Sequence, residues 1–458
     1  MSKRFASMSR RPLAAALFVA LVAPGMAFAE TAKEKELEAR VAHLEQQIQA
    51  LLSSQQQQQT AIADTQAQVT EVKTAQAAPA DGKPRIQTAP IMPGANPGTV
   101  FSYGGFIKMD AMATDTSDGR IADGSSGRLF YLPSTIPVGA DGVDGGDPYT
   151  DFHAQFSRFW FGADTVTDSG NKLKAYIEAD FFGGGSNALA GNETSTNTYA
   201  VTLRQAYVSW NNWLAGQTWS NFMDTAALPD AVDFVGTTDG TIFVRQAQLR
   251  YTKGPWSFSA ENPQTTITPY LNAGARFNSG DNVMPDLTAR YVTKGDWGHF
   301  SVAGLVRQFK YLDETETGGA VSVSGKFNLG KSDDLRYAVN AGSGIGRYLA
   351  FGLGSDTVLD ANGDLDALDG VGAFVAWRHV FTPQLRGNLM YSAASFDNDK
   401  AITGFGVTER AQSLHANLIY SPIPKLDLGA ELIWGQRSLE DEREGDLKRL
   451  QTSVKYNF

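Results

Sequence analysis

Alternation of apolar and polar residues is the feature that most constrains how this chain folds. From Phe101 onward, segments of about ten residues alternate with a period of two, and none shows the 3.6-residue period of a helix. One face of these segments is apolar, as in Leu173, Ala175, Ile177 and Ala179. The pattern predicts β-strands with one face in an apolar environment and the other face in contact with water.

The connections between these segments alternate between short and long. Seven are short, at 168–170, 211–212, 253–255, 294–296, 330–334, 382–383 and 421–424. Eight are long and rich in Gly, Asp and Asn, near 115–152, 183–197, 219–241, 263–285, 310–318, 344–369, 397–406 and 437–446. The count predicts an all-β transmembrane barrel of about sixteen antiparallel strands, with periplasmic turns and longer extracellular loops. A soluble β protein is the alternative, but it would not need this asymmetry.

Composition excludes several classes of protein. The 458 residues include no Cys and five dispersed His, so neither a disulfide scaffold nor a Cys-ligated or His-rich metal site is expected. The net charge of −10 argues against a nucleic-acid surface. No stretch after the first thirty residues is apolar enough to span a bilayer as a helix.

The N-terminus is expected to be an export signal. Four basic residues precede an apolar run of about ten residues, and Ala27 to Ala29 fits the small-residue cleavage rule. We expect residues 1–29 to be removed, and the loss of four positive charges from −10 leaves −14. A transmembrane anchor is the less favoured interpretation, because the run is short.

Residues 30–77 are predicted to form a coiled-coil oligomerisation helix. Eleven successive residues fall at a and d positions of a heptad, and eight of them are apolar. The eleven are Leu37, Val41, Leu44, Ile48, Leu51, Gln55, Gln58, Ile62, Thr65, Val69 and Val72. The a and d residues nominally favour two strands, although the Gln layers weaken that rule. A partly disordered Gln/Ala segment is the alternative. Residues 78–100 contain five Pro and are predicted to be an extended linker before the barrel domain, 101–458.

If the apolar face meets lipid, the other face lines the pore. The inward cations are then Lys108, Arg158, Lys174, Arg204, Arg250, Arg290, Arg307, Lys326, Arg336, Arg378, Arg386 and Lys455. The inward acids are fewer: Asp110, Glu178, Asp180, Glu261, Asp427 and Glu431. A net-positive wall favours anions, and Arg binds carboxylates through two hydrogen bonds. The alternative is that these cations pair with acids and only stabilise the wall.

The third long loop, residues 219–241, is expected to fold into the pore. It carries four acids that would face the cationic wall at a constriction: Asp224, Asp230, Asp233 and Asp239. An ordinary surface loop is the alternative. The run Asp360 to Asp366 has alternating oxygen ligands but departs from the EF-hand pattern, so a solvated acidic loop is favoured over a calcium site. No catalytic site, metal or cofactor is expected, and His415 and Asn417 are interpreted as polar pore lining.

Several segments resemble the DcaP-like porins of Gram-negative bacteria. They are Gly105–Ala111, Ser157–Phe159, Leu203–Trp210, Leu214–Phe222, Arg245–Thr252, His415–Pro422 and Gly429–Leu432. The resemblance covers the barrel, and a preceding coiled coil is also a feature of that family. It implies a homotrimer in the outer membrane that passes small anions such as dicarboxylates. We expect a trimer, although the a and d residues nominally favour a two-stranded coiled coil, because barrels of this kind impose the stoichiometry.

The sequence therefore predicts a passive outer-membrane porin for small, preferably anionic solutes. Arg158, Arg204, Arg250, Arg290, Arg307 and Arg386 are predicted to form a central ladder of weak contacts, opposed by Asp230 and Asp233. One alternative is a general diffusion pore with little selectivity. Another is an envelope tether, whose coiled coil contacts peptidoglycan while the barrel acts as an anchor. Neither an enzyme nor a nucleic-acid partner is expected.

Overall fold

The computed structural model describes residues 99–139, 147–183, 197 and 199–458. The predicted signal peptide, coiled coil and nearly all of the predicted linker lie outside the described residues. The chain divides into two compact units, 1–84 and 85–458, and every described residue belongs to the second. The first barrel strand begins at Thr99, two residues before the predicted boundary.

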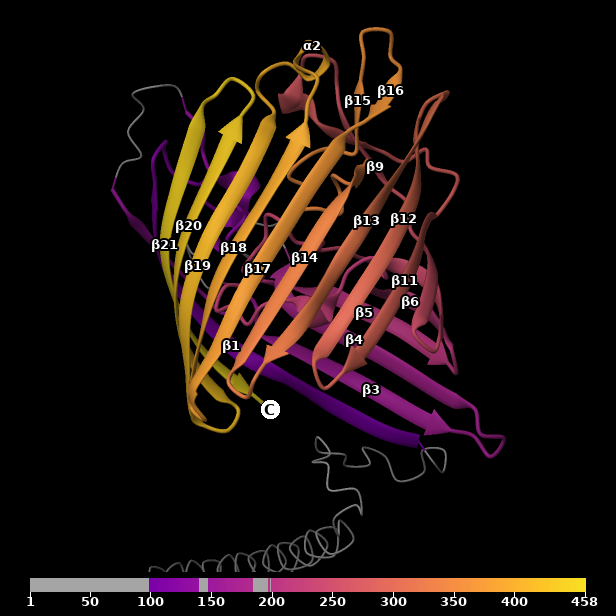
Figure 1. Ribbon diagram of the computed structural model, residues 1–458, viewed down its shortest axis with the longest axis vertical. Coiled ribbons are helices and arrows are strands. Elements are labelled where there is room, and N and C mark those ends of the chain that lie inside the picture. The colour runs from indigo at the N-terminus through magenta and orange to yellow at the C-terminus, as the bar shows by residue number, and fades with distance from the viewer. Residues whose placement is uncertain (1–98, 140–146, 184–196, 198) are drawn as a thin grey trace, which may run out of the picture. The chain divides into compact units, whose positions relative to one another are not determined.

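The second unit is a closed barrel of sixteen antiparallel strand positions (Figure 1). One position is shared by β2 (Tyr149–His153) and β3 (Arg158–Val166), which both pair with β1 (Thr99–Thr116). The other strands are β4 (Lys172–Gly183), β5 (Ala200–Trp210), β6 (Trp213–Trp219), β7 (Arg245–Lys253), β8 (Trp256–Glu261), β11 (Asp286–Gly295), β12 (Gly298–Tyr311), β13 (Glu314–Leu329), β14 (Asp333–Ser343), β17 (Asp369–Thr382), β18 (Leu385–Asp397), β19 (Thr408–Ile423), β20 (Leu426–Leu439) and β21 (Glu444–Asn457). Pairing of β21 with β1 closes the ring, which confirms the predicted barrel.

The seven predicted short turns each join two barrel strands. Two connections predicted to be long are instead short: 312–313 between β12 and β13, and 440–443 between β20 and β21. The backbone pairs of β12 and β13 continue to Tyr311 and Glu314. Side chains there are polar, and because the ends of these strands extend beyond the apolar wall, no apolar face is needed for the hairpin to continue.

The long loops carry a smaller sheet and several short helices. This sheet contains β9 (Thr265–Thr268), β10 (Phe277–Ser279), β15 (Thr357–Leu359) and β16 (Leu365–Ala367). The helices are η1 (Ser126–Arg128), η2 (Pro133–Thr135), η3 (Thr225–Ala227), η4 (Ala273–Ala275) and α2 (Lys400–Thr403). Within the described part of the chain, no helix has the length and apolar character needed to cross a membrane.

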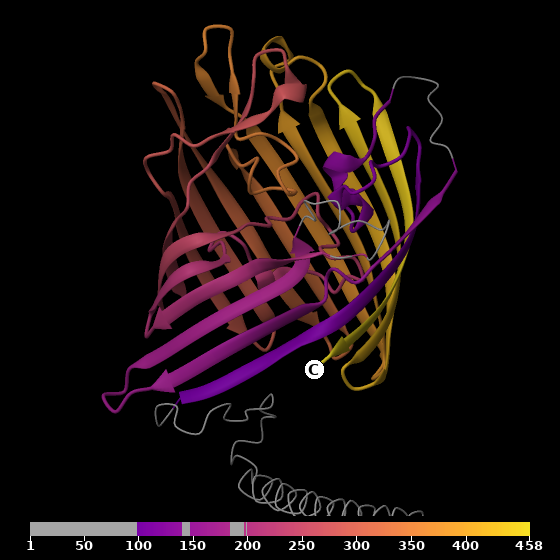
Figure 2. The same ribbon diagram turned by 180° about the vertical axis from the view of Figure 1, so that it is seen from behind.

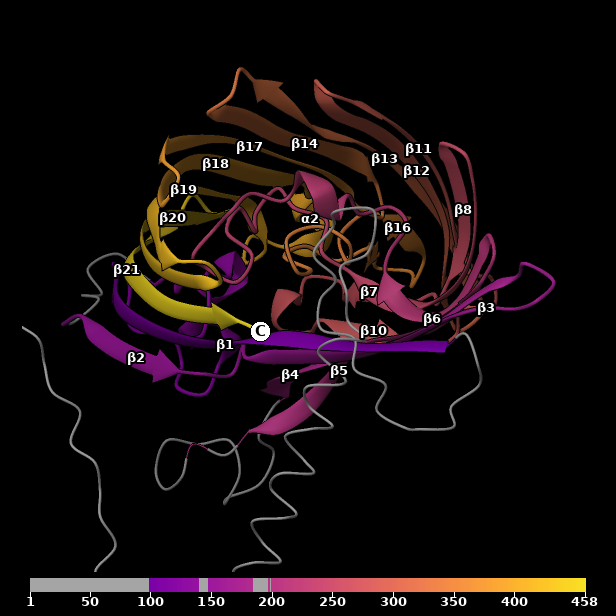
Figure 3. The ribbon, with the colours of Figure 1, turned by 90° about the horizontal axis from the view of Figure 1, so that it is seen from below.

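The two faces of the barrel wall differ in the way the alternation predicts. Large apolar side chains such as Ile107 and Leu432 point outward and are exposed. Figures 1 and 2 show β12–β14 and β17–β21 on one wall and β1 and β3–β6 on the other, and Figure 3 shows loop segments inside the ring of strands. We call three of these segments L1 (117–139), L3 (220–244) and L6 (344–356). Their apolar residues form buried clusters inside the barrel, so the core of this unit is partly made by loops.

Candidate functional site

L3 folds into the lumen and contacts several strands around it. The Val232 carbonyl oxygen accepts a hydrogen bond from Lys108 Nζ of β1 at 2.7 Å, and the Val232 amide donates to Glu431 of β20 at 2.6 Å. Farther along, the Gly240 amide donates to Ser392 Oγ of β18 at 2.7 Å. These contacts hold L3 across the interior of the barrel, so it narrows the lumen.

Asp224 holds the first part of L3 against one wall. Its carboxylate accepts hydrogen bonds from Arg290 Nη2 at 2.8 Å, His299 Nε2 at 2.8 Å and Ser324 Oγ at 3.0 Å. Burial alone would raise the pKa of Asp224, but the Arg290 charge and the His299 hydrogen bond outweigh it, so the pKa lies below its ordinary value. Asp224 is therefore a carboxylate at neutral pH.

Asp230 holds the middle of L3 against two arginines of the wall, Arg378 and Arg386. Arg386 Nε donates to Asp230 at 2.6 Å, and Arg378 Nε lies 3.5 Å from it. Arg378 also pairs with Asp334 at 3.1 Å, and Arg336 pairs with the same aspartate at 2.8 Å. Arg386 further contacts Asp427 at 3.4 Å. The three arginines and three aspartates form a network without net charge.

The other two predicted constriction acids are buried against neutral groups. Asp233 accepts hydrogen bonds from the backbone amides of Tyr131, at 2.8 Å, and of Val235 and Gly236, each at 3.1 Å. Asp239 accepts hydrogen bonds from Tyr131 Oη at 2.8 Å and from Ser413 Oγ. Burial is the main cause that raises the pKa of Asp233, and it raises the pKa of Asp239 to about 6 despite these two donors. Both acids attach L3 to L1, and neither has a cation within 4 Å among the described residues.

Arg158 and Arg204 share the acids of β4. Arg204 donates to Glu178 at 2.7 Å and to Asp180 at 2.6 Å, and its side chain is buried. Arg158 lies 3.9 Å and 3.7 Å from the same two carboxylates. Two positive charges therefore meet two negative charges at this position.

Arg307 is separated from the solute path by L6. Its guanidinium is almost fully buried, and it pairs with Asp356 of L6 at 2.6 Å and with Asp286 at 3.2 Å. It also donates to the carbonyl oxygens of Gly344 and Gln264, each at 2.5 Å. Arg307 thus fixes L6 inside the barrel, whereas the sequence had placed it in the central ladder.

Three inward cations have no carboxylate within 4 Å among the residues that the structure describes: Arg250, Lys326 and Lys455. Arg250 donates to Gln248 at 2.8 Å and to the Trp219 carbonyl at 2.5 Å. The Nζ atom of Lys455 lies 4.4 Å from the centre of the Phe106 ring. All three side chains are half-buried. They are the inward cations of this set whose charge is not locally balanced.

The two remaining predicted cations are paired. Lys108 contacts Asp110 at 2.8 Å, and Lys174 lies 3.5 Å from Asp164 in an exposed pair. Such an exposed pair contributes little to stability.

Seven of the twelve predicted inward cations line two recesses of the lumen. One is a cavity of about 270 Å³, lined by charged residues and by aromatic rings: Lys108, Arg158, Arg204, Arg386, Lys455, Asp230, Asp233, Asp427, Phe106, Phe156, Trp219, Phe234 and Phe243. The other, of about 550 Å³, is lined by Asp224, Arg290, Lys294, His299 and Lys326. Lys294 was not among the residues predicted from the sequence, although it continues the inward face of β11 two positions beyond Val292.

His415 lies in a buried chain of polar groups. Its Nδ1 atom is 2.8 Å from Glu431, and its Nε2 atom is 3.2 Å from Ser413 Oγ. The sequence had offered no serine partner, and this order resembles a Ser–His–acid triad. However, all three side chains are fully buried or nearly so, Ser413 donates to Asp239, and neither Ser413 nor His415 lines either lumen recess. The chain of groups therefore supports L3 and offers no access to a substrate.

No described group of three His, Cys, Asp or Glu side chains is arranged to hold a metal ion. In the acidic run, Asp360 accepts hydrogen bonds from the amides of Asn362 and Asp364, at 2.8 Å and 2.9 Å. Its carboxylate thus stabilises its own turn, as Asp side chains commonly do.

The chain matches one protein family over most of its length. The model of the DcaP outer membrane protein family matches residues 22–458. No match was found among curated proteins.

The chain is similar to several solved structures of outer-membrane channels. The outer membrane channel DcaP of Acinetobacter baumannii is 26% identical, with a TM-score of 0.64, and the match covers 80% of this chain and 99% of that one. OmpF of Salmonella typhi, solved with daunomycin, is 11% identical with a TM-score of 0.49, covering 80% and 99%. An anion-selective porin from Comamonas acidovorans is 11% identical with a TM-score of 0.48, covering 79% and 100%.

Three observations indicate an outer-membrane channel: the closed sixteen-stranded barrel, the loop folded into its lumen and the family match. Families of this kind consist of channels and porins, which are generally not enzymes. The chain belongs to the DcaP outer membrane protein family and is a porin-type channel of the outer membrane.

Proposed function

We propose that this porin passes small anionic solutes, dicarboxylates among them, by passive diffusion, and that it works as a homotrimer. The observation that carries the proposal is that cations without a nearby carboxylate are more accessible than acids without a nearby cation. Arg250, Lys326 and Lys455 are half-buried without a carboxylate within 4 Å among the described residues. Asp233 and Asp239, which lack a cation at that distance within the described part of the chain, are buried. A solute in the lumen therefore meets more positive than negative charge.

The mechanism requires only attraction and weak contact. An anion loses water at the constriction, and contacts with the Arg and Lys side chains compensate for the free-energy cost of that loss. Because each of these contacts is weak, the anion can leave again. Guanidinium groups suit carboxylates because their donors match the two oxygens. The two recesses give such an anion two successive places of contact on the wall. No cofactor takes part in this mechanism.

The test is the reversal potential of the purified channel in a planar bilayer under a salt gradient. The proposal predicts anion preference, and added succinate should reduce the chloride current as it occupies the same contacts. Cation preference would contradict the proposal. Crosslinking in membranes tests the stoichiometry, for which a band at three times the protomer mass is expected.

A general pore with little selectivity is the second candidate. It is favoured by the neutral network of Arg336, Arg378 and Arg386 with their aspartates, which shows that many inward cations stabilise the wall. The same measurement separates the two: a reversal potential near zero, with no effect of succinate, would support the general pore.

A further inference from the structure

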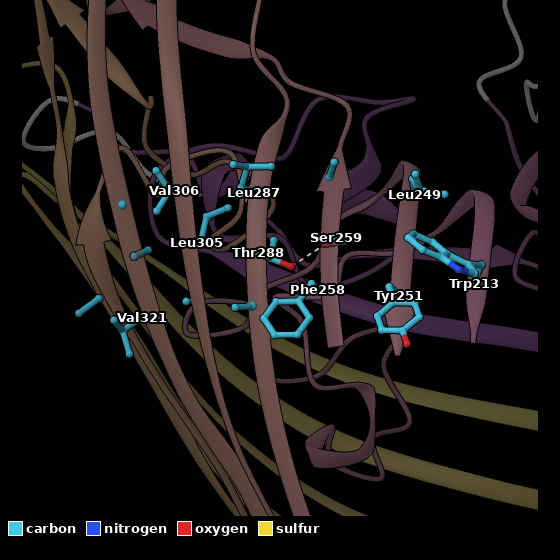
Figure 4. A pocket seen from close by; sticks show the side chains of 16 residues that line it. Trp213, Leu249, Tyr251, Phe258, Ser259, Leu287, Thr288, Leu305, Val306 and Val321 are labelled. Carbon is cyan, nitrogen blue, oxygen red and sulfur yellow. Dashed lines mark hydrogen bonds between the residues drawn. The ribbon is translucent and has the colours of Figure 1, made fainter. Parts of the chain in front are cut away.

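A hollow of about 870 Å³ lies on the outer face of the barrel wall, away from the lumen (Figure 4). It crosses β6 to β14, and its walls are apolar side chains that point away from the barrel axis. Leu249, Leu287, Val306 and Val321 are each between 44% and 62% exposed. This face of a porin-type channel meets the membrane, so the occupant of the hollow must tolerate hydrocarbon.

Cross-strand register explains the direction of the hollow. Tyr251, Phe258, Ala289, Gly304 and Val321 are successive register partners on β7, β8, β11, β12 and β13. They form a row perpendicular to the strands. Because barrel strands are tilted by about 35–45°, a row of this kind runs obliquely across the bilayer.

A second row runs beside the first. Leu249, Ala260, Leu287, Val306 and Gly319 are likewise successive partners across the same strands. Large side chains of one row thus stand beside small residues of the other. The two rows together give a groove and not a flat wall.

Small residues make the floor of this groove. A Cβ atom added at Gly304 would meet no atom within 4 Å, so the space above it is open. At Gly319 the only atom nearby would be the Leu305 carbonyl oxygen, at 3.0 Å. Glycine inside a strand weakens the strand and often marks a place where a ligand approaches the backbone closely. The open space above Gly304 therefore leaves room for an occupant close to the backbone.

One end of the groove carries polar groups. Trp213 is the first residue of β6 after a short turn, and its ring lies 4.7 Å from the ring of Tyr251. Lys253 follows two positions later on the same face of β7 and is exposed. Short turns of such barrels are periplasmic, and Trp and Tyr prefer the membrane interface. A cation and two aromatic donors thus stand at the periplasmic boundary, beside an apolar groove.

We propose that this groove binds one acyl chain of a phospholipid from the periplasmic leaflet, with the phosphate group at Lys253. The groove's polar end matches a headgroup, and its apolar length matches a chain that descends into the hydrocarbon. The charge of Lys253 at the end of the groove favours a phosphate-bearing lipid over a second copy of this protein.

The test fills the groove and measures lipid retention. Ala289→Leu adds bulk to the floor, while the control Ala430→Leu adds the same bulk to the outward face of β20, where Ala430 is also exposed. Native mass spectrometry of the complete protein, extracted in mild detergent with phosphatidylglycerol, should show a bound lipid per barrel for the wild type and the control. We expect at least a fivefold lower occupancy in Ala289→Leu.

A second readout locates the lipid. In bilayers of phosphatidylglycerol brominated on the acyl chain, the difference in fluorescence between the wild type and Trp213→Phe reports quenching at Trp213. We expect Ala289→Leu to reduce this quenching relative to Ala430→Leu. Equal retention and equal quenching in both variants would overturn the proposal, and so would dissociation of an oligomer by Ala289→Leu, because a second copy would then occupy the groove.

Discussion

Arg250 is the arginine of the predicted ladder that has no carboxylate within 4 Å among the described residues. Its hydrogen bonds go to neutral oxygens of Gln248 and Trp219, so its positive charge is not cancelled locally. At about 7 Å in water a unit positive charge stabilises an anion by about 0.6 kcal/mol and destabilises a cation by as much, which together correspond to about eightfold in the ratio of their permeabilities. Arg250→Gln should lower the anion-to-cation permeability ratio by about that factor, measured as reversal potential. Arg250→Lys keeps the charge and should keep the ratio; if both variants behave alike, the charge of Arg250 does not set selectivity.

Asp239 should make the attachment of L3 depend on pH. Burial raises its pKa from an ordinary value of 3.8 to about 6. A raised pKa means that the folded loop binds the proton more tightly, so this stabilisation is complete below about pH 4 and is lost as the pH rises through 6. After correction for intrinsic exchange rates, amides at 237–241 should exchange hydrogen faster at pH 7.5 than at pH 5. Asp239→Asn should remove this difference, and its persistence in that variant would show another group to be responsible.

At the scale of elements, the position of L3 depends on a close approach between backbones. A Cβ atom at Gly240 would lie 2.1 Å from the Ala373 carbonyl oxygen of β17, and the Gly240 carbonyl accepts a hydrogen bond from Asn340 at 2.8 Å. Gly240→Ala should therefore push L3 off the wall and destabilise the barrel by about 1–3 kcal/mol.

The measurement for Gly240→Ala is the temperature at which the folded band disappears on SDS gels, which should fall by several degrees. Gly304→Ala is the matched control, because its Cβ would point into open space. An unchanged midpoint for Gly240→Ala would mean that L3 can move without loss of stability.

The strands were predictable because alternation and turn residues are local signals. Each short turn lies between two segments whose apolar face can be read from about ten neighbouring residues. The ion pairs of the lumen were not predictable in this way. Arg386 and Asp230 are 156 residues apart, and Arg307 and Asp356 are 49 apart. Such partners depend on how loops fold inside the barrel, and a list of inward cations does not contain that information.

For the loops inside the barrel, too, the general position was predictable but the individual contacts were not. The inward fold of the third loop was expected from its acids, yet Asp233 and Asp239 contact Tyr131 and Ser413 instead of the cationic wall. Tyr131 belongs to L1, for which the sequence offered only a long, Gly-rich segment. Its buried phenol could have been suspected only from the apolar run Leu129–Leu132 within a loop that is otherwise mostly polar.

At the scale of the whole molecule, the lumen charge acts through the solution that fills it. The distance over which salt screens a charge falls from about 10 Å at 0.1 M to about 3 Å at 1 M. Anion preference should therefore be strong at 0.1 M and nearly lost at 1 M, measured as reversal potential at a fixed ratio of concentrations. Selectivity that does not change with salt would indicate a steric filter instead of an electrostatic one.

The seam of the barrel has a consequence for how the protein is made. Residues 106–116 of β1 pair with residues 447–457 of β21, so the contacts that close the barrel join parts of the chain more than 330 residues apart. Contacts of such long sequence separation fold slowly. Until β21 is in place, two strand edges carry unpaired backbone groups that hydrocarbon cannot satisfy. A barrel without β21 therefore leaves edges that hydrocarbon cannot satisfy, and we expect stable residence in the membrane to require closure of the seam.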